Sequence, residues 1–375
     1  MIKAARRKVV YKGAYAFSTI AIPVIYRWAR HFGELRYLSA KECRRWEKNM
    51  LTMLREYCKE EFQSPIIKVV YTFPKAKIEV INKRQTPDPG EIIVALCVKN
   101  DLERLKMLVE HYRKLGICRF AFLDNGSTDG TFEWAGEQPD IDLYRTYDTY
   151  QTNVKEGWMN RLVSHYGFNR WYVVTDSDEL VSYVGMEEHP LSDVVDHAER
   201  HGIKRFKSLT LDMYADASVF TGVGDLKRDF CWMDADSYRH NTATILSTKT
   251  EVYSGGPRSR VMGSDAPLQK YPLIYVDEGM VIADAHYQYP FREPLKEPIY
   301  LAIQHYKFTE GDLKTYQDRS GSAGGFYKKG IFYKAYMDAY RENKDLSFMY
   351  EGSVKFEDSG SLKKVSHLME IPFDK

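Results

Sequence analysis

Short apolar runs alternate along residues 92–175 with stretches in which apolar residues recur every three or four positions. A short apolar run predicts a buried strand, and the longer spacing predicts a helix. Strands and helices in this alternation predict an α/β fold, a mainly parallel sheet with helices on both faces. The expected strands are residues 92–97, 118–123, 141–144 and 171–175, and the expected helices are 102–115, which Gly116 ends, and 156–166.

The pattern before this region predicts a helical extension. Apolar residues between 40 and 62 keep a helical spacing. Ser39 and Glu42 form a capping-box pattern at the start of this expected helix, and Pro65 ends it. The elements expected next are strands at residues 66–73 and 77–81 and a linker at residues 82–90.

After residue 180 the pattern weakens. Residues 320–325 are rich in Gly and Ser and suit either a flexible lid or a simple surface loop. The elements expected here are strands at 208–214 and 242–253, a tight turn at 255–258 and a late helix at 331–341. We therefore predict three parts: an amino-terminal helical and hairpin extension (1–85), a sheet domain (86–310) and a carboxy-terminal helical region or lid (311–375).

The composition is that of a globular protein. The 375 residues are 44% hydrophobic and 14% aromatic, which is enough for a packed core. A net charge of +2 gives no general reason to expect a nucleic-acid partner. The five cysteines lack any Cys-x-x-Cys spacing, so neither a disulfide framework nor a zinc site is predicted, and a reducing cytoplasm is the simplest compartment.

The first 33 residues combine basic charge with an apolar stretch. They contain Lys and Arg at seven positions and no acid. Residues 14–24 are nearly uncharged but too short to cross a bilayer, and Pro23 interrupts them. Bulky and basic residues follow instead of a cleavage site, so secretion is not predicted. The segment is expected to lie on an anionic membrane at its cytoplasmic face, or else to be a helix packed on its own domain.

Three carboxylates follow the last apolar run of the expected sheet: Asp176, Asp178 and Glu179. Residues i and i+2 of a strand share a face, so Asp176 and Asp178 converge on one point if the chain stays extended. Their oxygens would suit a divalent cation that also binds phosphate. An isolated Asp-x-Asp is more often a solvated turn, so its surroundings decide between the two interpretations.

Two more polar clusters follow expected strands, at residues 98–100 and 124–129. Ligands of open α/β sheets bind beyond the carboxyl ends of the strands, so all three clusters are expected to line one crevice. Asp124 suits a hydrogen bond from a nucleobase edge or a ribose hydroxyl. Ser127 and Asp129 suit caps of the helix that follows.

Taken together, these stretches resemble a glycosyltransferase of the nucleotide-sugar-binding type A fold, a Rossmann-like sheet with flanking helices. The likeness is to family 2 and its relatives with an Asp-x-Asp-Glu motif. It covers residues 91–310 approximately, and segments 1–85 and 310–375 match nothing in that family. The matching blocks are Val98-Lys-Asn100, Phe122-Leu-Asp-Asn-Gly-Ser-Thr-Asp-Gly-Thr131, Gly157-Trp-Met-Asn160 and Asp176-Ser-Asp-Glu-Leu180, with weaker matches at 211–214, 255–258 and 304–307.

The resemblance implies roles for individual residues. Asp124 is expected to contact the nucleotide base, and Asp176 and Asp178 to hold Mn²⁺ or Mg²⁺ on the donor diphosphate. That ion neutralises charge on the departing nucleoside diphosphate. A UDP-sugar donor and a glycan or glycolipid acceptor are expected, in surface polysaccharide or lipopolysaccharide synthesis. The residues expected to bind the nucleotide sugar are Val98, Asn100, Asp124, Asn160, Asp176, Ser177, Arg258 and Lys307.

Family 2 enzymes invert the anomeric centre, which requires a carboxylate base for the acceptor hydroxyl. This chain has no obvious copy of the usual Glu-Asp base motif. The candidates are Asp212, Asp234 and Asp265, and each can instead be a structural carboxylate. Arg258 has the same ambiguity, since it can meet phosphate or form a structural ion pair.

The third protein ligand of the metal is expected to be a histidine. His305 precedes Lys307, which can meet a phosphate, whereas His286 has no nearby cation. Some type A glycosyltransferases use a late histidine in this way, so the resemblance favours His305. Either residue can instead be a buried histidine satisfied by the backbone.

Two other classes of protein are compatible with the sequence. One is a non-catalytic carbohydrate-binding or scaffold protein of the same fold, which would bind glycan without consuming nucleotide sugar. The other is a sugar-nucleotide pyrophosphorylase, which needs a Gly-rich signature with Arg and Lys after the first strand; residues 97–101 do not supply it. A phosphatase of the haloacid type is disfavoured because Thr is missing after Asp178.

Overall fold

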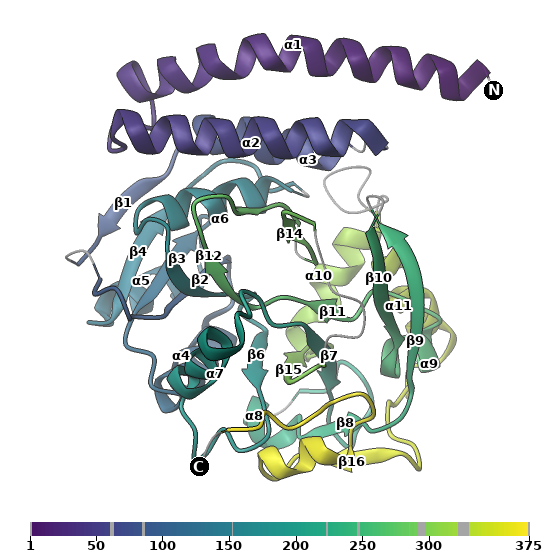
Figure 1. Ribbon diagram of the computed structural model, residues 1–375. Coiled ribbons are helices and arrows are strands. Elements are labelled where there is room, and N and C mark those ends of the chain that lie inside the picture. The colour runs from purple at the N-terminus through teal and green to yellow at the C-terminus, as the bar shows by residue number, and fades with distance from the viewer. Residues whose placement is uncertain are drawn as a thin grey trace.

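The computed structural model describes residues 2–60, 64–84, 87–151, 153–222, 224–245, 248–284, 286–291, 298–321 and 330–373. Three helices precede the sheet: α1 (Ile2–Phe32), α2 (Ala40–Glu60) and α3 (Ser64–Lys75). Figure 1 shows α1 as the outermost layer, with α2 and α3 between it and the rest of the protein. None of the described helices is long and apolar enough to cross a membrane.

The central sheet has six strands in the order β1-β4-β3-β2-β5-β12. The four inner strands, β4, β3, β2 and β5, run parallel, and the edge strands β1 and β12 pair antiparallel to them. The mixed, mainly parallel sheet is therefore confirmed, whereas a type A arrangement stays a prediction. The strands are β1 (Glu79–Asn82), β2 (Ile93–Val98), β3 (Phe120–Asp124), β4 (Ile141–Arg145), β5 (Arg170–Val174) and β12 (Leu273–Val276).

Helices cover both faces of this sheet because its strands are apolar on both sides. Val94 and Phe122 pack into one core with α4 (Leu102–Lys114) and α7 (Leu191–His201). Ala95 and Leu123 pack into a second core with α1–α3 and α6 (Val154–Ser164). Neighbouring residues of a strand point to opposite faces, which explains why an unbroken apolar run is needed here.

A second sheet of four strands is formed by segments that follow β5 in the chain. Its order is β11-β7-β15-β6, in which β15 runs parallel to β7 and antiparallel to β6. Its strands are β6 (Glu179–Ser182), β7 (Ser208–Met213), β11 (Gln269–Lys270) and β15 (Leu301–Tyr306). The remaining elements are α5 (Thr131–Glu137), α8 (Leu226–Asp229), β8 (Trp232–Asp234), β13 (Val281–Ile282), β14 (Gln288–Tyr289), α10 (Glu310–Gly321), α11 (Ile331–Glu342), β16 (Ser353–Lys355) and the 3-10 helix η2 (Ser359–Lys364).

The amino-terminal helices share a core with the sheet. Tyr26 of α1, Trp46 of α2 and Phe73 of α3 are buried together with sheet residues such as Ala95. Pro23 lies inside α1 and does not end it. The predicted capping box of α2 is confirmed, because Ser39 and Glu42 exchange side-chain to backbone hydrogen bonds of 2.8 and 3.2 Å. The division into three parts stays a prediction.

The prediction of a strand at residues 66–73 is wrong, since this segment is α3. Ile66, Val69, Val70 and Phe73 are all buried, and their spacing of three, one and three positions marks one face of a helix. The β-branched composition suggested a strand, but burial of this face against α6 decides the structure. The strand expected at 77–81 is present as β1.

Two expectations in the carboxy-terminal half also need correction. Residues 242–253 do not form one strand; they belong to a hairpin of β9 (Tyr238–Ile245) and β10 (Thr248–Gly255). The turn expected at 255–258 is the start of α9 (Gly256–Met262), with a proline in its first turn. The helix expected at 331–341 is confirmed as α11, and the lid-like segment 320–325 lies mostly outside the described residues.

A glycine allows α3 and α6 to approach closely. A Cβ atom at Gly157 would lie 2.5 Å from Cβ of Thr72. We expect Gly157→Ala to lower the free energy of unfolding by about 1–3 kcal/mol, because the helices must move apart. A helical control is Gly136→Ala in α5, where the nearest atom is 3.6 Å away and no loss is expected. Equal unfolding free energies for the two variants in denaturant titrations would contradict this packing.

Candidate active site

The polar clusters after β2, β3 and β5 are joined to one another by hydrogen bonds. The backbone N–H of Asn100 donates to Oγ of Ser127, and that of Thr128 donates to Oδ1 of Asn100. Asn100 holds a left-handed φ of 51° that permits this exchange. The hydroxyl of Ser177 donates to Asp101 at 2.5 Å, which ties the third cluster to the first. The carboxyl ends of three parallel strands therefore form one continuous polar rim.

The chain does not stay extended from Asp176 to Asp178, so the condition under which they would share a face is not met, and the metal role of Asp176 stays a prediction. The backbone turns after β5, with the N–H of Glu179 donating to the carbonyl of Asp176. Asp176 instead pairs with the ammonium groups of Lys155 and Lys270. Burial opposes ionisation, but these two cations hold the pKa of Asp176 at about 2. Asp176 is thus a partner of lysines in this structure.

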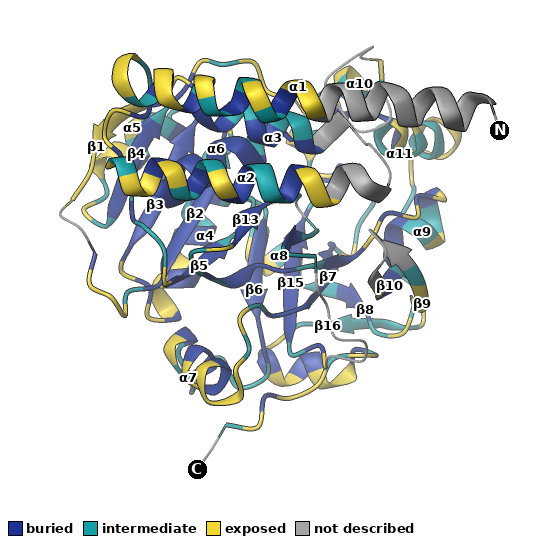
Figure 2. Ribbon diagram, turned by 45° about the horizontal axis from the view of Figure 1, so that its top comes forward, coloured by how far each residue is buried: buried dark blue, intermediate teal, exposed yellow. Residues whose placement is uncertain are grey.

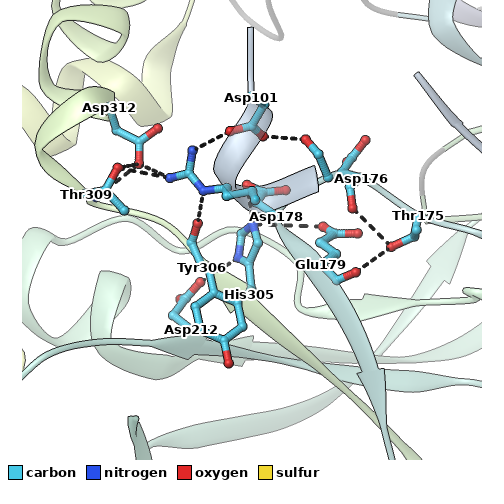
Figure 3. A network of polar contacts seen from close by, with 12 residues as sticks. Asp101, Thr175, Asp176, Asp178, Glu179, Asp212, His305, Tyr306, Thr309 and Asp312 are labelled. Carbon is cyan, nitrogen blue, oxygen red and sulfur yellow. Dashed lines mark hydrogen bonds and ion pairs between the residues drawn. The ribbon is translucent and has the colours of Figure 1, made fainter. Parts of the chain in front are cut away.

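A different set of carboxylates meets the predicted histidine. Asp178, Glu179 and His305 place one ligand atom each within 4.8 Å of one another. Nε2 of His305 is 3.4 Å from Asp178 and 3.9 Å from Glu179. Glu179 and His305 are buried, and Asp178 is half-buried at the rim. Figure 3 shows the imidazole lying between these carboxylates.

Strand pairing creates this cluster. His305 of β15 lies opposite Glu179 of β6 on one side and opposite Asp212 of β7 on the other. Side chains directly opposite one another on paired strands are close enough to interact. The cluster therefore depends on the register of the second sheet.

Asp212 is placed to orient His305. Its Oδ1 lies 2.7 Å from Nδ1 of the imidazole, and its Oδ2 accepts a 2.6 Å hydrogen bond from Nε of Arg258. Burial opposes ionisation, but Arg258 and His305 hold the pKa of Asp212 at about 2. A carboxylate with so low a pKa and both oxygens engaged is a poor base. It fits the role of fixing the imidazole so that Nε2 faces the carboxylates.

The donor set of this cluster fits a divalent cation. Two carboxylates and an imidazole nitrogen suit Mn²⁺, and carboxylate oxygens also suit Mg²⁺. The second partner of His305 supports this interpretation, since a histidine that binds a metal usually bonds a carboxylate through its other nitrogen. Glu179 is the ligand candidate that takes the place expected for Asp176. Lys270 pairs with Glu179, so it would have to share or release that carboxylate.

Lys307 brings an unpaired cation to the same place. Within the described part of the chain, its ammonium makes no hydrogen bond or ion pair. Burial opposes its charge, but Asp178 raises the pKa of Lys307 above the usual value. The protonated amine beside a carboxylate cluster is suited to a phosphate oxygen.

Arg104 anchors the rim to the helix α10. Its guanidinium bonds Asp101, the carbonyl of Tyr306 at 2.9 Å and the carboxylate of Asp312. Asp101 in turn holds Ser177, so one arginine links the turn after β5 to both β15 and α10. This linkage limits the motion of Asp178 and Tyr306 relative to each other.

Asp124 is buried in its own turn. Its oxygens accept hydrogen bonds from the backbone N–H groups of Gly126 and Ser127 at 3.0–3.1 Å, and Nε of Arg145 lies 3.2 Å away. Through these contacts Asp124 fixes the backbone conformation of the loop after β3. Its contact with a nucleotide base stays a prediction.

Several other predicted site residues have structural partners. Asn160 bonds the backbone of Ile282 in both directions and donates to the carbonyl of Glu156, which attaches α6 to β13 and commits both amide hydrogens; its contact with a donor sugar stays a prediction. Val98 is buried and pairs with Asp124 across β2 and β3. Arg258 is committed to Asp212, so the expected phosphate contact gives way to an ion pair.

The two remaining base candidates also have partners. Asp234 is fully buried and accepts hydrogen bonds from Tyr214 at 2.7 Å and from Arg260 at 3.0 Å. Asp265 is half exposed and pairs with Arg239 at 2.5 Å. Neither carboxylate belongs to the cluster around His305 in the described residues.

Sequence reasoning assigned no role to Asp101, Arg104, Lys155 or Lys270. Only Lys155 carried a signal, since it directly precedes the predicted helix 156–166 and lies next to the matched block 157–160. Glu156 beside it is buried, has one unpaired oxygen, and its pKa is raised to about 7, mainly by burial. Glu156, Lys155, Asp176 and Lys270 line one small cavity of about 20 Å³.

No protein-family model and no curated protein matches the chain. Among solved structures, the chain is similar to residues 1–349 of TarS from S. aureus, with 11% identity over 68% of this chain and 72% of that chain, at a TM-score of 0.29. It is also similar to the mannosyltransferase PcManGT from Pyrobaculum calidifontis, solved in complex with GDP-Man and Mn²⁺. That likeness has 14% identity over 49% of each chain, at a TM-score of 0.23. Likeness at these TM-scores carries neither a fold nor a function over to this chain.

A metal-binding role for His305 can be tested without an activity assay. We expect His305→Ala to weaken Mn²⁺ binding by about tenfold or more in calorimetric titration of the full chain, because an inner ligand is lost. The matched control is His286→Ala, whose imidazole bonds the carbonyl of Gln269 at 2.7 Å and lies outside the cluster. Asp212→Asn should weaken Mn²⁺ binding less than His305→Ala does. Identical Mn²⁺ affinities in the wild type and all three variants would reject the site.

Proposed function

We propose that this protein is a metal-dependent glycosyltransferase that transfers a sugar from a nucleoside diphosphate donor to a glycan or glycolipid. The observation that carries the proposal is the cluster of Asp178, Glu179 and His305 at the carboxyl ends of parallel strands, with the ammonium of Lys307 beside it. Such a cluster suits a cation-bound diphosphate, because ligands of α/β sheets bind at this edge. The sequence blocks 98–100, 122–131 and 176–180 support the same assignment.

The residues of the chain have separate tasks in this proposal. Asp178, Glu179 and His305 would hold Mn²⁺ or Mg²⁺, which supplies positive charge to the departing diphosphate. Lys307 would bind a phosphate oxygen and add a second positive charge. Asp212 keeps the imidazole of His305 in one orientation, and the link from Arg104 through Asp101 to Ser177 positions the turn that carries Asp178.

The nucleoside end of the donor is proposed to lie over the loops after β2 and β3. Asn100 and Asp124 hold these loops together, as described above, and the loop backbone is then presented to the ligand in one conformation. Next to them the guanidinium of Arg145 stacks 3.8 Å above the ring of Phe132, and Tyr147 is 74% exposed. An exposed aromatic ring at this edge suits a nucleobase. A UDP-sugar is the donor we favour, on the resemblance of the sequence blocks.

An inverting displacement also follows from that resemblance. The pairing of Asp212 with Arg258 and His305 favours an orienting role for it, and Asp234 and Asp265 are engaged by arginines. The acceptor base is therefore best sought among carboxylates that a bound acceptor would face. Surface polysaccharide or lipopolysaccharide synthesis in the cytoplasm, at the inner membrane face, is the setting we propose.

The proposal predicts turnover that needs a divalent cation. In a nucleotide-release screen of common sugar nucleotides with Mn²⁺ and Mg²⁺, we expect one donor to be consumed, and EDTA to abolish this. Asp178→Asn should reduce the rate by about 100-fold or more, because the metal ion that would bind the reacting diphosphate loses a charged ligand. The control is Asp338→Asn, a half-exposed acid of α11 that pairs with Arg341. A glycan-binding protein without catalysis would release no nucleotide from any donor, and a pyrophosphorylase would need pyrophosphate.

The role of Lys307 predicts a loss of affinity for the nucleoside diphosphate itself. Lys307→Met should weaken UDP binding in the presence of Mn²⁺ by about 1.5–3 kcal/mol, the value of a hydrogen bond to a charged group. Lys204→Met is the control, because Lys204 pairs with Asp277 on the surface and is 57% exposed. Calorimetric affinities that match in the wild type and Lys307→Met would remove Lys307 from the donor site.

A further inference from the structure

Helix α1 has two apolar faces, and only one of them is covered. The inner face packs into the core through Ile22, Tyr26 and Ala29, which are at most 1% exposed. The opposite face carries large apolar side chains at intervals of three or four residues. They are Phe17, Ile20, Val24, Trp28 and Phe32, and each is 59–74% exposed.

This outer stripe of α1, defined by those five residues, has no counterpart elsewhere in the described residues. Twelve large apolar side chains are exposed there, and five of them belong to the stripe. Spacing of three and four places them on one side of a helix. Figures 1 and 2 show that α1 is the outermost layer, so the stripe faces away from the protein. A large exposed apolar row is typical of a surface that binds another protein or a membrane.

Charge indicates what covers it. Residues 1–33 contain Lys3, Arg6, Arg7, Lys8, Lys12, Arg27 and Arg30 and no Asp or Glu. Figure 2 shows α2 beside α1, and α2 adds exposed Lys41, Arg44, Lys48 and Arg55 against exposed Glu42 and Glu56. A helix with an exposed apolar stripe, in a segment whose sequence is basic and free of acid, suits the interface of an anionic bilayer, where apolar side chains enter the acyl boundary and cations meet the headgroups.

We propose that α1 docks this protein on an anionic membrane, lying in the plane of the surface with the outer stripe inserted. Such a helix would extend over about 46 Å of the surface. This inference rests on the exposed face of α1 and does not depend on the glycosyltransferase proposal. It names the residues of α1 that would contact the membrane, which the sequence alone did not specify.

The orientation follows from the packing of α1. Tyr26 stacks on Phe73 of α3 with ring centroids 5.8 Å apart, and its hydroxyl donates to the carbonyl of Val70. Because these contacts fix the rotation of α1, the stripe and the sheet lie on opposite sides of the helix. The bilayer would therefore lie against α1 while the sheet stays in water.

The test uses the full chain in flotation with vesicles of phosphatidylcholine alone or mixed with phosphatidylglycerol. We expect flotation with the anionic vesicles at low salt, little with the neutral ones, and a loss as salt is raised. The triple variant Ile20→Ser, Val24→Ser, Phe32→Ser should bind anionic vesicles about tenfold more weakly or worse. The protein has six tryptophans, so insertion of Trp28 is read as the part of the blue shift in tryptophan emission that Trp28→Phe loses.

The matched control is the double variant Ile331→Ser, Met369→Ser, which removes exposed apolar side chains of α11 and the carboxy-terminal segment. It should float like the wild type. Wild-type protein that does not float, floats equally with neutral vesicles, or loses nothing in the triple variant would overturn the proposal. Light scattering that shows a dimer converted to a monomer by the triple variant would assign the stripe to a second copy of the chain instead. Donor turnover without a membrane should be the same in both variants, so failure here is distinct from failure of the proposed enzyme.

Discussion

The compensation of buried carboxylates by cations is the constraint on which the rest of this site depends. Asp176 faces Lys155, Glu179 faces Lys270 and Asp212 faces Arg258, while Asp178 lies 3.4 Å from Nε2 of His305. An ionised carboxylate that loses its solvation costs several kcal/mol unless an opposite charge and hydrogen bonds replace the water. Each pair here joins two segments that are distant in the sequence, so the charges can be accommodated only when the sheets and helices are in place.

The sheet architecture explains why these groups gather at one edge. Four parallel strands carry mostly apolar side chains on both faces, and a charge inside them needs its own partners, as Asp142 of β4 has in Arg119 and Tyr166. Polar residues are displaced to the ends of the strands, and parallel strands bring all their carboxyl ends to the same edge. Asn100, Asp101 and Ser177 then join the loops by hydrogen bonds. The rim is thus a consequence of the core as well as of the polar residues themselves.

The charged cluster and the exposed apolar surface lie in different parts of the protein. Charge is concentrated around His305, where a diphosphate and a cation can offset it. Apolar surface is concentrated on α1, on the far side of the amino-terminal helices, where a bilayer can cover it (Figure 2). An acceptor anchored in a membrane would have to reach past α1–α3 to meet the rim.

Local sequence determined those features that depend on neighbours along the chain. The apolar runs, the capping box of α2, the stop at Gly116 and the polar ends of β2, β3 and β5 could all be predicted, because strand and helix periods and turn chemistry are local. Tertiary structure decided the rest. Composition favoured a strand at 66–73, but burial of one face against α6 made it a helix, and a turn after β5 separated Asp176 from Asp178. His305 meets Asp212, 93 residues away, only because β15 pairs with β7 in one register, and no local pattern encodes the register of strands so far apart.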